Sequence, residues 1–234
     1  MAQRVVFFID NNNKYQQKKV DFQWFPGFAK KQAQKSVASL HKIFLEKYPT
    51  AKILEVSTAA KEKLGLKLSA FNLQVKTTKG SYSVEQLFQS GKVFEKHGSQ
   101  NALLHTPSAQ AKKAIKKLNK NDKLVGFQEF GVDFPLTPST YFYNWIYLKG
   151  IQQNKELAEQ LLKYDAFTDI YFNPQKSINC QAEACSIYIS LFKRNLLKDA
   201  LKDRKSFLKV VYGNQNETKK RNSDGPIYEQ LELL

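Results

Sequence analysis

Residues 81–94 read SYSVEQLFQSGKVF, and this stretch predicts a helix that borders the hydrophobic core. Ser83 can cap the free backbone amides at the helix start, and Gln86 completes a capping-box pattern. An apolar stripe follows at helical spacing: Val84, Leu87, Phe88 and Gly91. Three polar residues stand in one column beside this stripe: Glu85, Gln89 and Lys92. The spacing alone leaves open whether the column is a solvated face or the wall of an active site.

The rest of the chain has the composition of a folded globular protein. It has 234 residues, of which 42% are hydrophobic and 13% are aromatic, enough to build a sizeable core. No change of composition divides residues 1–212, which predicts one domain, and the polar residues 213–234 predict a flexible tail. No apolar run of about 18 residues occurs, and the start is too soon polar for a signal peptide. We therefore expect a cytoplasmic monomer with no membrane segment.

The pattern of apolar residues predicts the fold class. Helical spacing dominates after residue 80, whereas the strand candidates are short and scattered, so we expect an α+β fold, a helix-rich single domain with a small sheet. Strands are expected over residues 5–9, 52–57, 69–77 and 124–134. Helices are expected over residues 29–48, 83–94, 109–123, 140–151, 154–165 and 182–203. Residues 10–19 are interpreted as a turn, and the stretch from 166 to the last helix as a loop.

The cysteines and histidines do not indicate a metal site. Cys180 and Cys185 fall on nearly opposite sides of a predicted helix, with no cysteine or histidine cluster beside them. We interpret them as reduced thiols. The chain has 3 histidines, and none is part of a convincing Ser/His/Asp set. His41 falls on the apolar face of a predicted helix, where a packed imidazole is expected. The sequence therefore predicts neither a metal nor a cofactor.

The strongest compositional signal is charge. The chain has 37 Lys and Arg against 21 Asp and Glu, a formal net charge of +16, which favours polyanionic partners. A lysine-rich composition that keeps the protein soluble is the alternative. The predicted helix over 109–123 carries lysines that could contact a phosphate backbone: Lys112, Lys113, Lys116 and Lys117. They lie outside the helix of Glu85 and Lys92, so we expect them to act separately from those two residues, unless they are only a solvated face.

The order of segments around the opening stretch resembles the NADAR family, also called YbiA-like. In that family a Phe-Ser-Asn-Phe segment precedes a helix of the form Thr/Ser-Val-Glu-His-x-Phe/Tyr-Gln-x-x-Lys. Here LSAF (68–71) precedes SVEQLFQSGKVF (83–94), and eight residues match at the same spacing: Ser69, Phe71, Ser83, Val84, Glu85, Phe88, Gln89 and Lys92. The resemblance is strongest over 66–94 and resumes more weakly as far as residue 181.

The chain departs from the family pattern at several positions. Gln86 replaces the helix His, and Ala70 replaces an Asn. In the later loop the family's Trp-Gly is missing, Lys176 stands where Asp is usual, and Asp169 is a displaced substitute for a Glu. These changes indicate a divergent branch with an added amino-terminal region.

The resemblance implies an N-glycosidase. Some family members cleave a ribosylamine intermediate of riboflavin synthesis, and others remove ADP-ribose from guanine in DNA, which reverses the modification made by DarT-type toxins. Breaking a C–N glycosidic bond requires stabilisation of a cationic sugar and a proton for the departing base. By this resemblance Glu85 would handle protons and Gln89 would orient the ligand. Lys92 would act either as a neutral amine that forms a Schiff base or as a cation.

We expect the substrate to be bound by residues around the matching motifs and by one aromatic side chain: Ser69, Phe71, Asn72, Phe88, Gln89, Trp145, Asp169 and Asn179. Trp145 belongs to an aromatic stripe in 140–151 that is either buried core or a base-stacking pocket. Of the two activities that the resemblance implies, the charge of +16 favours removal of ADP-ribose from guanine in DNA. The resemblance then also implies a cognate DarT-type toxin as a partner.

Two alternatives stay open: an N-glycosidase that acts on a small ribosylated metabolite, and a catalytically silent module that binds ADP-ribose or nucleic acid. Retention of Glu85 and Lys92 argues against the silent module, and a turnover assay separates the three.

Overall fold

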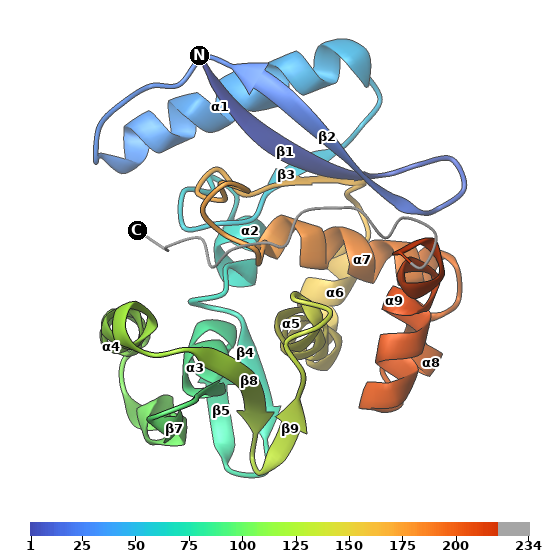
Figure 1. Cartoon of the computed structure of the whole chain (residues 1–234). Coiled ribbons are helices and arrows are strands. Elements are labelled where there is room, and N and C mark those ends of the chain that lie inside the picture. The colour runs from blue at the N-terminus through green and yellow to red at the C-terminus, as the bar shows by residue number, and fades with distance from the viewer. Residues whose placement is uncertain (220–234) are drawn as a thin grey trace.

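The computed structural model of the chain describes residues 1–219, which form the α+β fold predicted from the sequence (Figure 1). The helices are α1 (Lys30–Lys47), α2 (Lys63–Leu68), α3 (Val84–Ser90), the short 3₁₀ helix η1 (Asn101–His105), α4 (Ser108–Asn121), α5 (Tyr141–Gln153), α6 (Lys155–Leu161), α7 (Gln181–Lys193), α8 (Leu197–Ala200) and α9 (Arg204–Lys219). The strands are β1 (Ala2–Ile9), β2 (Tyr15–Phe22), β3 (Ile53–Glu55), β4 (Gln74–Thr77), β5 (Gly80–Ser83), β6 (Lys92–Phe94), β7 (Gly98–Ser99), β8 (Leu124–Glu129), β9 (Val132–Phe134) and β10 (Ala166–Thr168).

One layer of the molecule is a four-stranded sheet in the order β2-β1-β10-β3. β1 is antiparallel to β2 and to β10, whereas β10 and β3 are parallel. The alternating side chains of β1 serve two cores, because Val6 packs with Leu40 and Phe44 of α1, while Val5 and Phe7 belong to the larger cluster that includes α7. Figure 1 shows α1 and α7 on opposite faces of this sheet.

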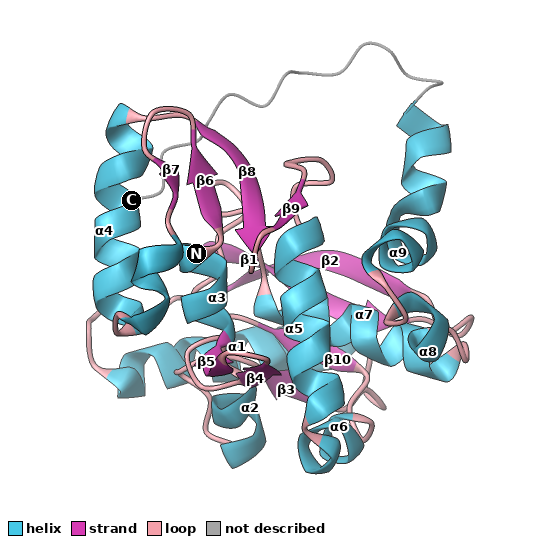
Figure 2. Ribbon diagram, turned by 90° about the horizontal axis from the view of Figure 1, so that it is seen from below, coloured by secondary structure: helices cyan, strands magenta, loops and turns pink. Residues whose placement is uncertain are grey.

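The second half of the molecule is built around α5, whose residues are buried on nearly every side. α3 packs against α5 and α4. A second four-stranded sheet, in the order β7-β6-β8-β9, and the β4–β5 hairpin lie on different sides of α3 (Figure 2). The motif stretch is therefore held between two small sheets and the central helix.

Several predicted elements differ from the structure. Residues 10–19, interpreted as a turn, include the start of β2, an edge strand whose outer residues are mostly polar and so hide the strand pattern. The predicted loop after 166 begins with β10, which is too short to show a period of two. Of the strand expected over 69–77, only Gln74–Thr77 is a strand, and α2 before it was not predicted.

Two further segments are interrupted by backbone turns. The strand expected over 124–134 is the β8–β9 hairpin, which reverses at Phe130 (φ 50°) and Gly131 (φ 84°). The helix expected over 182–203 ends at Lys193, and Asn195 (φ 56°) then turns the chain into α8. α9 continues to Lys219, so the expected domain boundary at 212 falls inside a helix. The rest of the expected tail, residues 220–234, lies outside the described residues.

Candidate active site

The start of α3 fixes Glu85 at the edge of the core. The predicted capping box is present: Ser83 Oγ accepts a hydrogen bond from the Gln86 amide at 3.1 Å, and the Gln86 side chain accepts one from the Ser83 amide at 3.0 Å. Glu85 therefore lies in the first turn, where the helix dipole favours a carboxylate. Its own amide donates to Ala70 O at 2.9 Å, which ties α3 to the LSAF segment.

The Glu85 carboxylate is buried and has two polar neighbours. Gln89, one helical turn later, donates through Nε2 to Glu85 Oε1 at 3.0 Å. The Lys112 ammonium of α4 lies 3.6 Å from the same oxygen. Gln89 is itself buried, and its Oε1 makes no hydrogen bond to any described residue. Gln89 thus presents a free amide oxygen beside the Glu85 carboxylate, and the charge of that carboxylate is balanced by the Lys112 ammonium.

Lys92 does not continue the helical column. The expectation that Glu85, Gln89 and Lys92 share one helix is wrong for Lys92, because α3 ends at Ser90 and Lys92 begins β6. The chain turns at Gly91, where a Cβ would lie 2.6 Å from the ring of Phe142. Packing against α5 therefore decides where the helix ends.

The Lys92 side chain nevertheless returns to the neighbourhood of Glu85. Its Nζ lies 5.0 Å from the centre of the Phe88 ring, and the whole residue is 5% exposed. Burial lowers the pKa of Lys92 to about 8, an effect that Glu85 opposes and the charge of Lys112 increases. The site thus contains an amine that is neutral in an appreciable fraction of molecules near neutral pH.

Asp169 joins the same site from the other half of the molecule. Its Oδ2 accepts a hydrogen bond from Gln181 Nε2 at 2.8 Å, and Gln181 Oε1 accepts one from the Ala70 amide at 2.5 Å. Gln181 therefore bridges Asp169 to the segment that holds Glu85. Burial raises the pKa of Asp169, whereas hydrogen bonds from Gln181 and the charge of Lys112 act in the opposite direction.

Tyr143 of α5 lies within the field of both acids. Burial raises the pKa of its hydroxyl well above the ordinary value, and the charges of Glu85 and then Asp169 raise it further. Tyr143 is therefore a protonated donor at every physiological pH. Its ring makes an edge-on contact with Phe88, with centroids 5.2 Å apart.

The structure places the other predicted binding residues at different depths. Ser69 is fully buried, and its Oγ, like Asn179 Oδ1, makes no hydrogen bond within the described residues. Phe71 is 38% exposed and has the Lys112 ammonium 5.5 Å from its ring centre. Asn72 is exposed and uses its Nδ2 to donate to Leu66 O at 2.7 Å. Phe88 packs in the core beneath Lys92.

Trp145 makes its contacts away from Glu85. Its indole Nε1 donates to Glu129 Oε2 at 3.3 Å, Lys149 Nζ lies 5.1 Å from its ring centre, and its ring meets Phe207 edge-on. It is 6% exposed. These contacts are those of a core residue, one of the two interpretations that the sequence left open.

The predicted lysines of α4 divide into two groups. Lys113, Lys116 and Lys117 are exposed on the outer face of the helix. Lys112 is exposed as well, but its ammonium points at Glu85 and Phe71, and this position favours a role beside Glu85 over one separate from it. α4 lies against α3, and this places the first turns of α4 beside the buried carboxylate.

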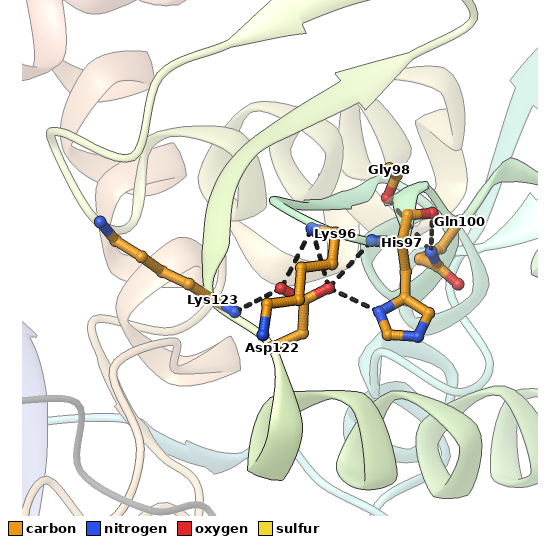
Figure 3. A network of polar contacts seen from close by, with 6 residues as sticks. All are labelled: Lys96, His97, Gly98, Gln100, Asp122 and Lys123. Atoms are coloured by element: carbon orange, nitrogen blue, oxygen red, sulfur yellow. Dashed lines mark hydrogen bonds and ion pairs between the residues drawn. The ribbon is translucent and has the colours of Figure 1, made fainter.

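The carboxylate of Asp122 anchors the end of α4 (Figure 3). It accepts hydrogen bonds from the backbone amides of Lys96 at 3.2 Å, His97 at 3.0 Å and Lys123 at 2.8 Å. The ring of His97 contributes a fourth contact at 2.6 Å. Burial alone would raise the pKa of Asp122, but the bonds from His97 and the amides lower it to about 2. These contacts of Asp122 with Lys96, His97 and Lys123, called the Asp122 clamp below, fix α4, and with it Lys112, to the β6–β7 turn.

Lys112, Tyr143 and Gln181 are the neighbours of the candidate site that sequence reasoning missed or placed elsewhere. Lys112 was read as one of several surface lysines, and Tyr143 was hidden in the aromatic pattern of α5. Gln181 belongs to no sequence motif that would have marked it as a site residue. The one available signal for Lys112 was its place near the buried face of its helix, next to Ala111.

Two absences can be stated for the part of the chain that the structure describes. No group of three or more His, Cys, Asp and Glu side chains in it is placed to hold a metal ion. Among the helices within residues 1–219, none combines the length and the hydropathy needed to cross a membrane.

Comparison with known proteins agrees with the resemblance seen in the sequence. A protein-family model described as DarT1-associated NADAR antitoxin matches residues 2–221, a range that includes the amino-terminal sheet and every candidate residue above. A search of the curated proteins finds no match. The family description associates its members with a DarT1 toxin. Because the match covers nearly the whole chain, the chain belongs to the NADAR family of DarT1-associated antitoxins.

Proposed function

We propose that this protein is an N-glycosidase that removes ADP-ribose from guanine in DNA and so reverses the action of a DarT1-type toxin. Members of the NADAR family are generally glycosidases or related hydrolases. The observation that carries the proposal is the arrangement of Glu85, whose carboxylate lies between the Gln89 amide and the Lys112 ammonium, with the buried Lys92 amine nearby.

The reaction breaks the bond between the anomeric carbon of the ribose and a guanine nitrogen. The anomeric carbon gains an oxygen from water, and the departing nitrogen takes a proton, so one water is consumed in each turnover. Positive charge develops on the sugar as the bond breaks, and the Glu85 carboxylate can stabilise it. Glu85 can also accept the proton of the attacking water and deliver it to the nitrogen.

Lys92 supports a second route to the same products. With a pKa of about 8, roughly a tenth of the molecules carry a neutral Lys92 amine near pH 7. In this route the amine forms a bond to the anomeric carbon of the opened sugar while guanine leaves with a proton. Water then adds to the resulting imine and releases both ADP-ribose and the lysine. If the amine stays protonated, Lys92 acts as a cation instead.

Buried polar atoms without protein partners are our candidates for the groups that orient the sugar. Ser69 Oγ, Gln89 Oε1 and Asn179 Oδ1 are buried and make no hydrogen bond to the described residues. Buried polar atoms are normally satisfied, so a ligand rich in hydroxyl groups would satisfy them here. The exposed ring of Phe71 offers an apolar face next to the Lys112 ammonium.

Charge favours DNA over a small metabolite as the carrier of the modified base. The net charge is +16, and the outer face of α4 carries exposed lysines on the same helix as Lys112, which lies next to Glu85. A phosphate backbone would meet this surface when a modified guanine enters the site. A small ribosylated metabolite would need no such surface.

The test is to incubate the protein with an oligonucleotide that carries one ADP-ribosylated guanine. Mass spectrometry should find free ADP-ribose and an oligonucleotide with an intact guanine. The corresponding modified nucleoside, at the same concentration, should be processed less efficiently. Binding of the oligonucleotide without any release would identify a silent binding module, and preference for the nucleoside would identify a metabolite enzyme.

A further inference from the structure

A chain of hydrogen bonds runs beside Asp169 and away from the candidate active site. Thr168 Oγ1 donates to Glu55 Oε2 at 2.6 Å, and the same Oγ1 lies 2.8 Å from His41 Nε2. Glu55 and Thr168 are paired neighbours on β3 and β10, whereas His41 comes from α1. These hydrogen bonds thus link the middle of the sheet to the layer formed by α1.

This series of hydrogen bonds ends at a small cavity between α1 and the segment that follows β3. The cavity has a volume of about 200 Å³, and His41 and Glu55 are among its lining residues, together with Gln34, Lys61 and Glu62. A cavity of this size with several polar groups in its wall can hold a few water molecules. His41 therefore borders a space that can hold proton donors and acceptors, and Glu85, Gln89 and Lys92 are not among the residues that line it.

The two carboxylate oxygens of Glu55 differ in their capacity to carry a proton. Oε1 accepts a hydrogen bond from Ser57 Oγ at 2.5 Å and one from the Ile170 amide at 3.0 Å. A proton on Oε1 would displace the Ser57 hydrogen bond and compete with the Ile170 amide, which can only donate, and Ser57 Oγ already accepts a hydrogen bond from the Ala59 amide at 3.1 Å. Oε2 faces Thr168, whose hydroxyl can turn because it has His41 Nε2 as a second possible acceptor. A proton on Glu55 therefore fits at Oε2.

The electrostatic surroundings determine the protonation states of Glu55 and His41. Burial, and after it the negative charge of Asp169, raises the pKa of Glu55 to about 8, so this carboxyl carries a proton near pH 7. Burial lowers the pKa of His41 to about 4, so its ring is neutral there. The other charged groups that face these residues are Arg4 and Lys112, which act on Asp169, and Lys61 and Glu62 in the cavity wall.

We propose that Glu55, Thr168 and His41 form a proton relay that couples the ionisation of Glu55, the buried carboxyl beside Asp169, to the tautomer of His41 at the cavity next to α1. In one state Glu55 is neutral and its Oε2–H donates to Thr168. The Thr168 hydroxyl donates to His41 Nε2, and the imidazole carries its proton on Nδ1. In the other state Glu55 is ionised, Thr168 donates to it, and His41 donates to Thr168 from Nε2.

Conversion between the states balances in protons. Glu55 gives its proton to the Thr168 oxygen, Thr168 passes its own proton to His41 Nε2, and the Nδ1 proton of His41 leaves to water. Glu55 can thus titrate without a proton crossing the substrate site. Because ionised Glu55 adds a second negative charge next to Asp169, the protonation state of Glu55 influences how readily Asp169 ionises. Glu55 is therefore a positioning residue that acts through Asp169, whether or not the protein is a glycosidase.

Nitrogen NMR of the ¹⁵N-histidine-labelled full chain tests the relay directly. Ring nitrogens with and without a proton have distinct chemical shifts, and the signals of His41 are assigned by their loss in His41→Gln. At about pH 6 and about pH 10, roughly two units either side of the Glu55 pKa, His41 should be the Nδ1–H and the Nε2–H tautomer respectively. The same tautomer at both pH values would overturn the proposal.

Three variants control for other causes. In Glu55→Gln the amide nitrogen takes the place of Oε2 and can only donate, so His41 should stay in the Nδ1–H form at both pH values. Thr168→Val removes the hydroxyl, and the tautomer should no longer change between the two pH values, whereas Thr168→Ser should restore the change. Amide spectra of each variant verify the fold. A tautomer change that persists in Glu55→Gln or in Thr168→Val would contradict the relay.

Discussion

At the scale of single residues, Lys92 has an amine whose proton affinity is set by the protein rather than by water. Burial lowers its pKa to about 8, although Glu85 opposes the effect. A lysine with an ordinary pKa of about 10.4 would be almost fully protonated near pH 7. The site therefore offers a neutral amine under conditions in which a surface lysine remains a cation.

The pH dependence of the reaction should reveal this amine if it attacks the sugar. The single-turnover rate should rise with pH and level off above about 8, because the neutral fraction of Lys92 rises through that pKa. Lys92→Arg retains a cation but no nucleophile, and it should lower the rate by about 100-fold or more. Borohydride should trap an adduct with the wild type only. Rates close to wild type in Lys92→Arg would show that Lys92 acts only through its charge.

Lys112 and Lys113 form a matched pair on α4 for separating the site from the surface. Lys112→Ala should slow cleavage of both a modified oligonucleotide and a modified nucleoside by roughly tenfold, because Glu85 loses the cation beside it. Lys113→Ala should affect only the oligonucleotide. Rate measurements on both substrates with both variants check this. Equal effects of the two variants on cleavage of the nucleoside would show that Lys112 is not part of the active site.

Sequence reasoning could find Glu85, Gln89 and Lys92 because one short motif carries all three. It could not assign Lys112, Tyr143 or Gln181, since their roles come from contacts between segments far apart in the chain. A lysine in a run of lysines has no local feature that marks it as the neighbour of a buried carboxylate.

At the scale of elements, the clamp at Asp122 holds α4 in place (Figure 3). Its hydrogen bonds lower the pKa of Asp122 from 3.8 to about 2. A lowered carboxyl pKa contributes stability that is present above the unfolded value of 3.8 and is lost as pH falls through about 2.

Asp122→Asn should therefore lower the melting temperature at neutral pH, because its NH₂ group would be placed among donors. The difference from wild type should shrink as the pH falls toward about 2, where the wild-type carboxyl is protonated as well. His97→Ala removes only one donor and should have the smaller effect. Calorimetry of the three proteins over a pH series checks both claims. An unchanged melting temperature in Asp122→Asn would mean that the clamp does not stabilise the fold.

Periodicity predicted the long elements and failed for the short ones. α1, α4 and α5 were found because each has an apolar pattern of several turns. β10 consists of three residues, and the end of α3 depends on the ring of Phe142 at Gly91, which no local pattern records. Tertiary contacts decide such boundaries.

At the scale of the whole molecule, the net charge of +16 should make DNA binding depend on salt. Four lysines of α4 that are exposed and make no contact with Glu85 can be changed to Gln, namely Lys113, Lys116, Lys117 and Lys120, which removes four candidate phosphate contacts and leaves Lys112 in place. The slope of log binding constant against log salt should fall by up to about three for a single strand. Cleavage of a modified nucleoside should be unchanged. An unchanged slope would show that these lysines do not contact DNA and only form a solvated helix face.

The fold class and the family were accessible from the sequence, but the assembly of the site was not. The sheet order β2-β1-β10-β3 joins the amino-terminal hairpin to the strand that precedes Asp169. Gln181 then connects Asp169 to Ala70 and so to α3. Each link pairs segments that are distant in the chain, and a single sequence contains no signal for such pairings.

The most direct test of the proposed function compares wild type with Glu85→Gln on an oligonucleotide that carries one ADP-ribosylated guanine. Glu85→Gln retains the shape of the side chain but removes the negative charge, and Glu95→Gln, at an exposed position, serves as the control. The rate of ADP-ribose release under single-turnover conditions is measured by mass spectrometry. The wild type and Glu95→Gln should release ADP-ribose at similar rates, whereas folded Glu85→Gln should bind the oligonucleotide and release almost none. No release by the wild type, or release by Glu85→Gln at the wild-type rate, would contradict the proposed function or the role of Glu85 respectively.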